Sequence, residues 1–130
     1  MSMLQDDPRY RIQVSVESEF LPEQSDAEGK RWVFAYHVSI HNAGEVSAKL
    51  LTRHWVITDG EERVQEVHGE GVIGEQPSIA PGQTYEYSSG AVLETSVGSM
   101  HGSYQMLAED GTCFDAVIPP FTLAPPHMLH

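Results

Sequence analysis

The stretch His68-Gly-Glu-Gly-Val-Ile-Gly-Glu-Gln-Pro77 decides between two folds, because its glycines have the G-x-G-x-x-G spacing of dinucleotide-binding loops. That motif needs a strand before it and a helix that opens inside the loop. Here the eight residues after the third glycine include two prolines, which prevent a helix of useful length. We therefore predict that Gly69, Gly71 and Gly74 shape an irregular connection, residues 69–82, between two β-strands.

On both sides of this connection, short runs alternate between apolar and polar residues, which is typical of half-buried strands. Turn-forming pairs such as Asp59-Gly60 and Asp110-Gly111 separate the runs. No window keeps an apolar period of 3.6 residues over three turns, so no long helix is expected. About seven short strands at this spacing predict an all-β fold, an antiparallel β-sandwich. The expected strands are residues 10–17, 32–41, 50–58, 63–67, 84–89, 100–108 and 113–118.

The phase of the apolar residues predicts which side chains form the core. In the third strand Leu51, Trp55 and Ile57 are in phase, and Trp55 is expected to pack inside. In the second strand, the alternate residues form a broad apolar face. The members of that face are Trp32, Phe34, Tyr36, Val38 and Ile40.

The length of 130 residues fits a single domain, residues 1–130, whose ordered core we expect at about residues 10–122. Residues 21–29 gather proline, glycine and acid, which predicts an exposed loop. Residues 90–99 predict a less regular connection. The N-terminus is expected to be flexible, and the tail from residue 119, with four prolines, should be extended beyond an initial edge pairing.

The formal charge of −12, from 19 acidic and 7 basic residues, opposes nucleic-acid binding, because phosphates would be repelled. The same field favours a basic protein surface or a cation, although an acidic total is most often a solubility feature. No run approaches about 18 consecutive apolar residues, and the N-terminus lacks the pattern of a signal peptide. We therefore expect no membrane partner and a cytoplasmic location.

Patterns typical of catalysis are absent from the sequence. Acid pairs such as Glu61-Glu62 and Glu109-Asp110 sit beside turns, where solvated charge is expected. Residues 99–103 lack the G-x-S-x-G elbow of serine hydrolases. The single cysteine, Cys113, excludes an intrachain disulfide, and its place in a predicted strand indicates a small core residue. The chain is therefore not expected to be an enzyme.

Seven histidines raise the question of a metal site. His37 and His41 have the i, i+4 spacing that binds zinc on a helix. On a strand, however, that spacing separates them by roughly 13 Å, because each residue rises about 3.3 Å. His54, His68 and His101 lie on different predicted elements and could converge only through the fold. We therefore predict no metal site.

A recognition surface could come from aromatic side chains or from a sheet edge. Trp32, Tyr36, Trp55 and Tyr104 are the aromatic candidates, but core packing is the expected role of Trp55 at least. A sandwich whose edges are not blocked can instead pair with a strand of a partner.

Four motifs occur in order along the chain, at residues 69–77, 80–82, 87–90 and 97–106. Together they resemble the bacterial ApaG family. The likeness runs from about Tyr10 to Pro125, and it implies a sandwich of the immunoglobulin or fibronectin type III-like class. Related domains in a eukaryotic F-box protein and a DNA polymerase delta-interacting protein imply a protein-interaction module. The family is also associated with a diadenosine tetraphosphatase, cobalt resistance and magnesium efflux, but the resemblance supplies no catalytic residues.

Our leading hypothesis is a non-enzymatic module that docks another protein through a face or an edge of the sandwich. The alternative is a nucleotide or pyrophosphate site at Gly69, Gly71 and Gly74, where a backbone nest could hold a phosphate-bearing molecule without a helix. A weaker third hypothesis is a metal-responsive protein. No cofactor is expected, and monomer and homodimer both stay open.

Overall fold

The second predicted strand forms the centre of one sheet, because its alternate residues are apolar and need burial. In the computed structural model, which describes residues 7–128, β2 (Trp32–Asn42) pairs antiparallel with β1 (Ile12–Phe20) and β6 (Thr84–Leu93). The flexible N-terminus that we predicted falls mainly on residues 1–6, outside this range. The predicted inner face of β2 is confirmed. Trp32 is half-buried, and the buried members are Phe34, Tyr36, Val38 and Ile40.

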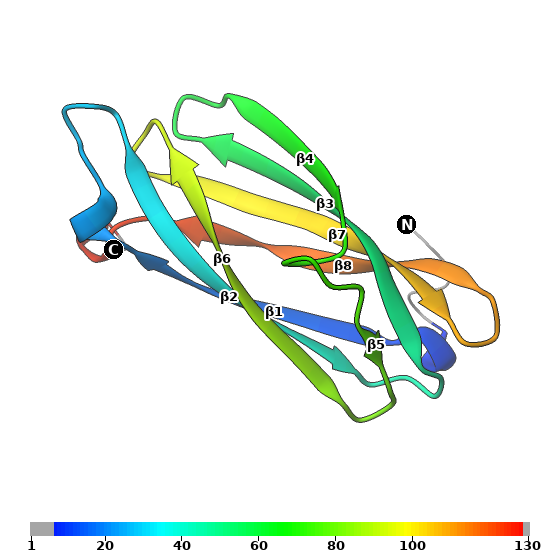
Figure 1. Cartoon of the computed structure of the whole chain (residues 1–130). Coiled ribbons are helices and arrows are strands. Elements are labelled where there is room, and N and C mark those ends of the chain that lie inside the picture. The colour runs from blue at the N-terminus through cyan, green and yellow to red at the C-terminus, as the bar shows by residue number, and fades with distance from the viewer. Residues whose placement is uncertain (1–6, 129–130) are drawn as a thin grey trace.

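The second sheet is built around β3 (Ala48–Asp59). It pairs with β4 (Val64–Glu70) on one side and with β7 (Gly98–Ala108) on the other, and β7 pairs with β8 (Cys113–Leu123). The short β5 (Ser78–Ile79) also pairs with β3. All pairings are antiparallel, so the predicted β-sandwich is confirmed (Figure 1). Residues 7–128 contain eight strands rather than about seven, because β5 adds a two-residue pairing.

Within residues 7–128, three single turns of 3-10 helix accompany the strands: Pro8–Tyr10, Pro22–Gln24 and Pro126–Met128. Each begins with a proline, whose fixed φ suits a first helical turn and whose missing amide hydrogen needs no partner there. Across residues 7–128, no helix has the length and apolar character that crossing a membrane requires.

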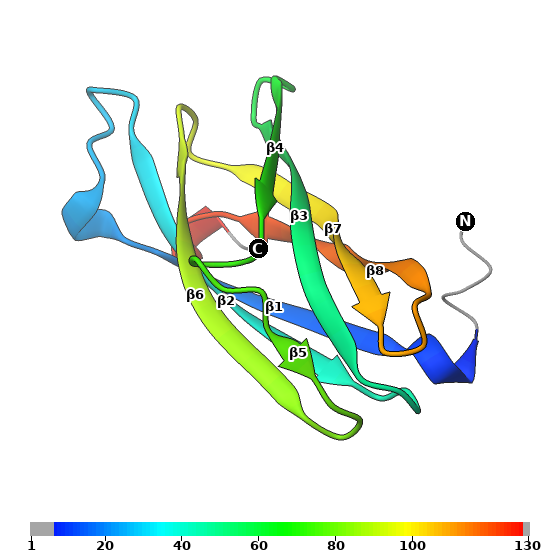
Figure 2. The same ribbon diagram turned by 45° about the vertical axis from the view of Figure 1, so that its right-hand side comes forward.

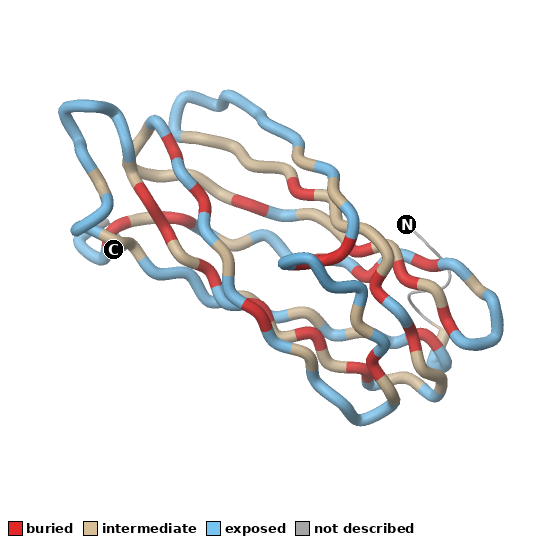
Figure 3. Tube along the Cα trace, viewed as in Figure 1, coloured by how far each residue is buried: buried red, intermediate tan, exposed pale blue. Residues whose placement is uncertain are grey.

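The core lies between the two sheets, and buried positions alternate with exposed ones along most strands (Figure 3). Trp55 is only 3% exposed, which confirms its predicted place in the core. Its ring makes edge-to-face contacts with Tyr36 of β2 and Phe121 of β8, at centroid distances of 5.4 and 5.9 Å. The contact with Tyr36 joins the two sheets through the centre of the sandwich, and the contact with Phe121 lies within the second sheet.

A β-bulge in β3 changes the predicted phase of that strand. The register with β7 shifts between Leu50 and Thr52, so β3 contains one extra residue there. Leu50 is fully buried and Leu51 is only half-buried, so the prediction that Leu51 is in phase with Trp55 is wrong. One inserted residue exchanges the inner and outer faces for every position beyond it.

Two predicted connections are shorter than expected, because the strands continue to pair beyond the clear alternation. β4 reaches Glu70, so Gly69 lies in a strand and not in a bent connection. β6 reaches Leu93 and β7 begins at Gly98, so only residues 94–97 connect them where we expected residues 90–99.

Two prolines do not end β8. Pro119 and Pro120 lie where the register with β7 shifts between Met100 and Gly102. A bulge on an edge strand tolerates proline, because the missing amide hydrogen removes no necessary ladder bond. The paired strand therefore extends to Leu123, past the predicted end at residue 118.

The first residue of β8 corrects another prediction. Cys113 is exposed, and it is not the core residue that we expected. Phe114 and Ala116, whose side chains point to the other face of β8, are buried. Cys113 therefore belongs to the outer phase of its strand.

The sandwich has two different sides. On the closed side, β1 lies beside β8, and Ser18 Oγ donates a hydrogen bond to the carbonyl oxygen of Thr122 at 2.9 Å. On the open side, the sheets end at β4 and β6, and residues 71–77 lead from β4 past β6 to β5, which pairs with β3 (Figures 1 and 2). This connection reaches β6, where the Tyr85 hydroxyl donates to the Glu75 carboxylate at 3.3 Å.

Candidate functional site

The first glycine of the predicted loop makes room for an arginine. Gly69 lies in β4 directly opposite Arg53 of β3, and a Cβ atom at Gly69 would lie 2.6 Å from Cζ of Arg53. Arg53 Nη1 donates to the carbonyl oxygens of Glu70 and Gly71, at 3.1 and 2.8 Å. The arginine thus fixes the point at which the chain leaves β4.

The other two glycines shape a tight turn at one end of the open side. Gly71 has φ +59° and Gly74 has φ +78°, both in the left-handed region that favours glycine. A Cβ atom at Gly71 would collide with the carbonyl oxygen of Glu75. Val72 and Glu75 exchange backbone hydrogen bonds of 2.8 and 2.9 Å, which close the turn. No helix starts at Gly74, as predicted.

Few amides in this turn are available to an anion. The amides of Gly71, Val72 and Glu75 already donate to backbone carbonyls. Within the described residues, those of Ile73 and Gly74 make no backbone hydrogen bond. The turn is flanked by two acidic side chains and has no helix dipole, both of which weaken its attraction for phosphate. Of the three predicted site residues, only Gly74 contributes one of these two free donors.

Beside the turn, a groove of about 370 Å³ runs along the open side between β3–β4 and β6. Arg53 and Gln65 are its polar side chains from the second sheet. It continues into a smaller pocket, because Ile57, Gln65 and Val92 line both. The smaller pocket is also lined by Arg63, Val64 and Glu94. Apolar and aromatic residues make up most of the groove. They are Tyr36, Trp55, Ile57, Val67, Ala91, Val92 and Met100.

Two buried features lie at or near the floor of the groove. Trp55 Nε1 is buried and has no hydrogen-bond partner among the described residues. Next to Arg53, the hydroxyls of Tyr87 and Tyr104 form a hydrogen bond with each other. Burial raises the pKa of both tyrosines well above its usual range, so both stay protonated at neutral pH. They hold the two sheets together and offer no base.

His37 and His41 both lie on β2, and their rings contact different partners on β6. The ring of His37 contacts Ser88 Oγ at 2.8 Å and Glu86 Oε1 at 3.0 Å. His41 Nδ1 contacts Thr84 Oγ1 at 2.8 Å. The two histidines therefore have no hydrogen-bond partner in common.

The fold does bring two other histidines together. His54 of β3 lies directly opposite His68 of β4, and their rings stack with centroids 4.2 Å apart and an angle of 9°. Glu66 joins them, with its Oε1 atom 2.8 Å from Nε2 of His54. His101 is on β7 opposite Val56 and is not part of this group. The cluster was not predicted, because the fourth strand was expected to end at residue 67 and β4 continues to Glu70.

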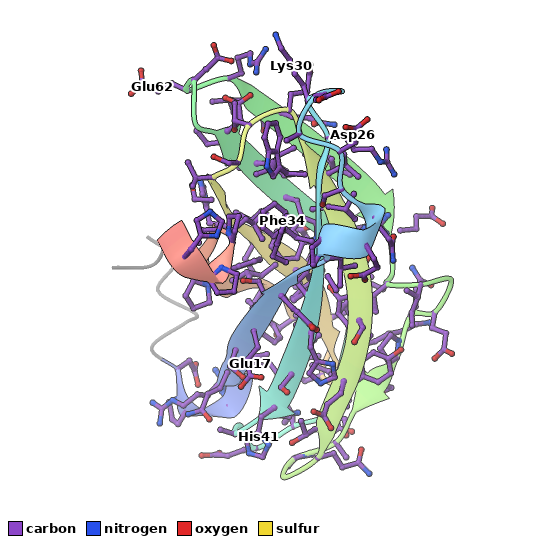
Figure 4. All side chains as sticks on the ribbon, turned by 90° about the vertical axis from the view of Figure 1, so that its left-hand side faces the viewer. Glu17, Asp26, Lys30, Phe34, His41 and Glu62 are labelled. Carbon is purple, nitrogen blue, oxygen red and sulfur yellow. The ribbon has the colours of Figure 1, made fainter. Side chains whose placement is uncertain are left out.

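The remaining candidates behave as ordinary structural or surface residues. Tyr36, Trp55 and Tyr104 are buried, so they do not form an exposed aromatic surface. Glu61 and Glu62 lie exposed in the β3–β4 turn, as expected for solvated charge. Figure 4 places Glu62 at the end of the sandwich opposite His41.

The fold and groove define a fibronectin type III-like β-sandwich with one open side. The profile of the ApaG domain matches residues 22–108. Protein ApaG of Aromatoleum aromaticum is 63% identical over 122 residues, which cover 94% of this chain and 96% of that protein. Protein ApaG of Pseudomonas putida strain KT2440 is 60% identical over 124 residues, 95% of this chain and 98% of the relative. The chain therefore belongs to the ApaG domain family, as the resemblance predicted.

Solved structures agree with this assignment. The crystal structure of an ApaA protein from Bordetella pertussis superposes with a TM-score of 0.88 at 51% identity, and the match covers 90% of this chain and 95% of that one. A second X-ray structure gives the same TM-score at 46% identity, covering 97% and 93%. The sandwich described above is thus the architecture of experimentally determined relatives.

Proposed function

We propose that this chain is a non-catalytic binding module that receives an extended segment of a partner protein in the groove on the open side. One observation carries the proposal: among the strands of residues 7–128, β4 and β6 each have one edge without a neighbouring strand, and these two edges border the same apolar groove. Edges of this kind are the sites at which sheets accept an added strand.

The two edges provide the hydrogen bonds for such docking. Among the described strands, β4 pairs only with β3, along its length, and β6 pairs only with β2. The outward amide and carbonyl groups of either strand can therefore form a ladder with a partner segment. The groove between them can take the alternate side chains of that segment, which provides specificity.

The rims of the groove are unusually apolar for exposed positions. Val64 on β4 is 62% exposed and Val92 on β6 is 50% exposed, and both line the smaller pocket. A partner segment that covers them removes apolar surface from water, which is favourable. Because the chain has a net charge of −12, we infer that the segment combines alternating apolar residues with lysine or arginine at its flanks.

The chemistry of the main groove supports a non-catalytic role. Its lining contains no carboxylate, imidazole or thiol. Arg53 is engaged with two backbone carbonyls, and Tyr87 and Tyr104 keep their protons. General acid–base catalysis requires a group that exchanges protons near neutral pH. The groove is instead suited to hold a chain in place.

Site-specific photo-crosslinking in the native cell extract tests the proposal. A photoreactive amino acid at Val92 should capture a partner protein, and the same group at Val117 should not. Val117 is the matched control, because it is 49% exposed but lies on β8. The captured segment should be extended, with the predicted apolar and basic residues. Equal capture at both positions, or capture only at Val117, would refute docking at the open side.

A second candidate, anion binding at the glycine turn, rests on the free amides of Ile73 and Gly74. Pyrophosphate and diadenosine tetraphosphate, titrated separately and followed by amide NMR, should shift Ile73 and Gly74 and leave Gly111 unchanged. Gly111 is the control because it is another turn glycine with positive φ, +90°. Unchanged Ile73 and Gly74 signals at millimolar ligand would exclude this site.

Two further properties stay predictions from composition and from the family. These are a cytoplasmic location and the association with cobalt resistance and magnesium efflux. Neither is needed for the docking proposal, which depends on the open side alone.

A further inference from the structure

The outer face of the second sheet holds a group of three metal-ligating side chains that the docking proposal does not use. His54, Glu66 and His68 offer ligand atoms that all lie within 4.8 Å of one another. In residues 7–128 this is the one group of three or more such residues. Each comes from a strand interior, so the sheet and not a flexible loop places it.

We infer that His54, Glu66 and His68 form a binding site for a divalent transition-metal ion of the zinc class. Two imidazoles and one carboxylate make a ligand set that Zn²⁺ uses in proteins, with a fourth position left for water. Imidazole nitrogen also selects such ions over Mg²⁺, which prefers oxygen ligands.

The geometry of the β3–β4 hairpin explains how the three ligands converge. His54 and His68 are directly opposite each other, which brings their Cβ atoms within about 5.5 Å. Glu66 is two residues before His68, so it points to the same face of β4. The inner face of the same hairpin is anchored by Trp55, which is paired with Val67 and only 3% exposed.

The side chains need only a small rearrangement to reach bonding distance. Two ligands on a tetrahedral zinc ion lie roughly 3.3 Å apart, since each bond is about 2.0–2.1 Å long. Nε2 of His54 and Oε1 of Glu66 are already 2.8 Å apart, and the His68 ring is stacked on His54. The side chains of His54 and Glu66 are 28% and 57% exposed, so they have room to turn.

An ion at this position would replace the hydrogen atom that His54 and Glu66 share. If His54 is neutral, that hydrogen moves from Nε2 to Nδ1 of the same ring, and no proton is released. If His54 is charged, one proton passes to solvent. In both cases the ion binds the lone pair of a neutral imidazole and a carboxylate, and the net charge of −12 favours its approach.

Calorimetric titration of the untagged full chain with Zn²⁺ tests the inference, in a Cys113→Ser background that removes the exposed thiol. We expect one ion per chain, and no heat with Mg²⁺. His54→Gln and His68→Gln should each weaken binding by at least about tenfold. Two variants are made so that failure of one to fold leaves the other as the test.

His37→Gln is the matched control. His37 also contacts a glutamate, Glu86, at 3.0 Å on an outer sheet face, but this pair does not belong to a group of three metal-ligating side chains. It should bind Zn²⁺ like the parent. A second readout is the melting temperature, which should rise with Zn²⁺ in the parent and in His37→Gln but not in His68→Gln. No binding at about 100 µM Zn²⁺, or an equal loss in His37→Gln, would overturn the inference.

Discussion

The closed and open sides of the sandwich each contain a tyrosine that donates a hydrogen bond to a carboxylate, but the two bonds differ. On the closed side, the Tyr10 hydroxyl lies 2.6 Å from Asp110, and on the open side the Tyr85 hydroxyl lies 3.3 Å from Glu75. The first bond ties the 3-10 turn Pro8–Tyr10, which precedes β1, to the β7–β8 turn. The second holds only a loop against β6. The difference shows that one side is fastened together, while the other keeps an accessible groove.

The largest effect is expected from the residue that joins the sheets beneath the open side. Trp55→Ala removes a buried ring that contacts Tyr36, Tyr104 and Phe121, so it should cost about 3–5 kcal/mol of unfolding free energy. Trp55→Phe should cost less than half of that, because it keeps part of the ring and removes the unpaired Nε1–H. Urea unfolding measures both. Equal losses for the two variants would mean that Trp55 does not span the sheets as described.

The next effect concerns the turn that ends the open side. Gly71→Ala should cost about 2–3 kcal/mol, because its backbone has φ +59° and the new Cβ meets the Glu75 carbonyl oxygen. Gly74→Ala is the control, with φ +78° but no atom within 4 Å of a Cβ, and should cost about 1 kcal/mol. Thermal unfolding of both variants ranks them. A larger loss for Gly74→Ala would contradict the described turn.

A smaller effect should separate the two tyrosine–carboxylate bonds. The pKa of Asp110 lies below its usual 3.8, mainly because of the hydrogen bond from Tyr10 and then because of those from Thr112. Tyr10→Phe removes the first of these bonds. Since a lowered carboxyl pKa stabilises the folded state above the unfolded pKa, the loss should be full at pH 7 and shrink below about pH 4. Tyr85→Phe, which breaks the longer bond, should lose less at pH 7. Unfolding curves at pH 7 and pH 3 measure this, and a loss independent of pH would contradict the role of Asp110.

Much of the sandwich could be predicted from alternation alone, because one buried face imposes a period of two on each strand. Trp55 and the inner face of β2 were found in this way. The bulge at Leu51 was not, because one inserted residue leaves no mark in the local pattern. Cys113 was misplaced for a similar reason, since a small residue at the start of a strand carries too little apolar signal to define its face.

The histidine cluster could have been predicted from the register of the β3–β4 hairpin. In an antiparallel hairpin each step back along one strand matches a step forward along the other. A turn that pairs Thr58 with Val64 therefore pairs His54 with His68, provided that β4 continues past residue 67. The signal was present in the Asp59-Gly60 turn, but the glycine at 69 hid the continuing strand. The open side itself could not be predicted, because it depends on how the two sheets pack.

The smallest change in stability should accompany the sharpest change in docking. Val92→Lys and Val117→Lys both replace exposed valines, so each should alter the unfolding free energy by no more than about 0.5 kcal/mol. Only Val92→Lys should prevent partner binding, because a charge at a strand edge opposes addition of a further strand. For this test the photoreactive group is placed at Val64, because Val92 is the mutated position. The amount of partner that each variant captures is then measured. Loss of capture in Val117→Lys would place the interface elsewhere.

Amide hydrogen exchange on the complex with the captured partner tests the docking proposal most directly. We predict that amides of β4 and β6 become protected when the partner binds, while those of β1 and β8 exchange as in the free protein. Protection confined to β1 and β8, with β4 and β6 unchanged, would contradict the account.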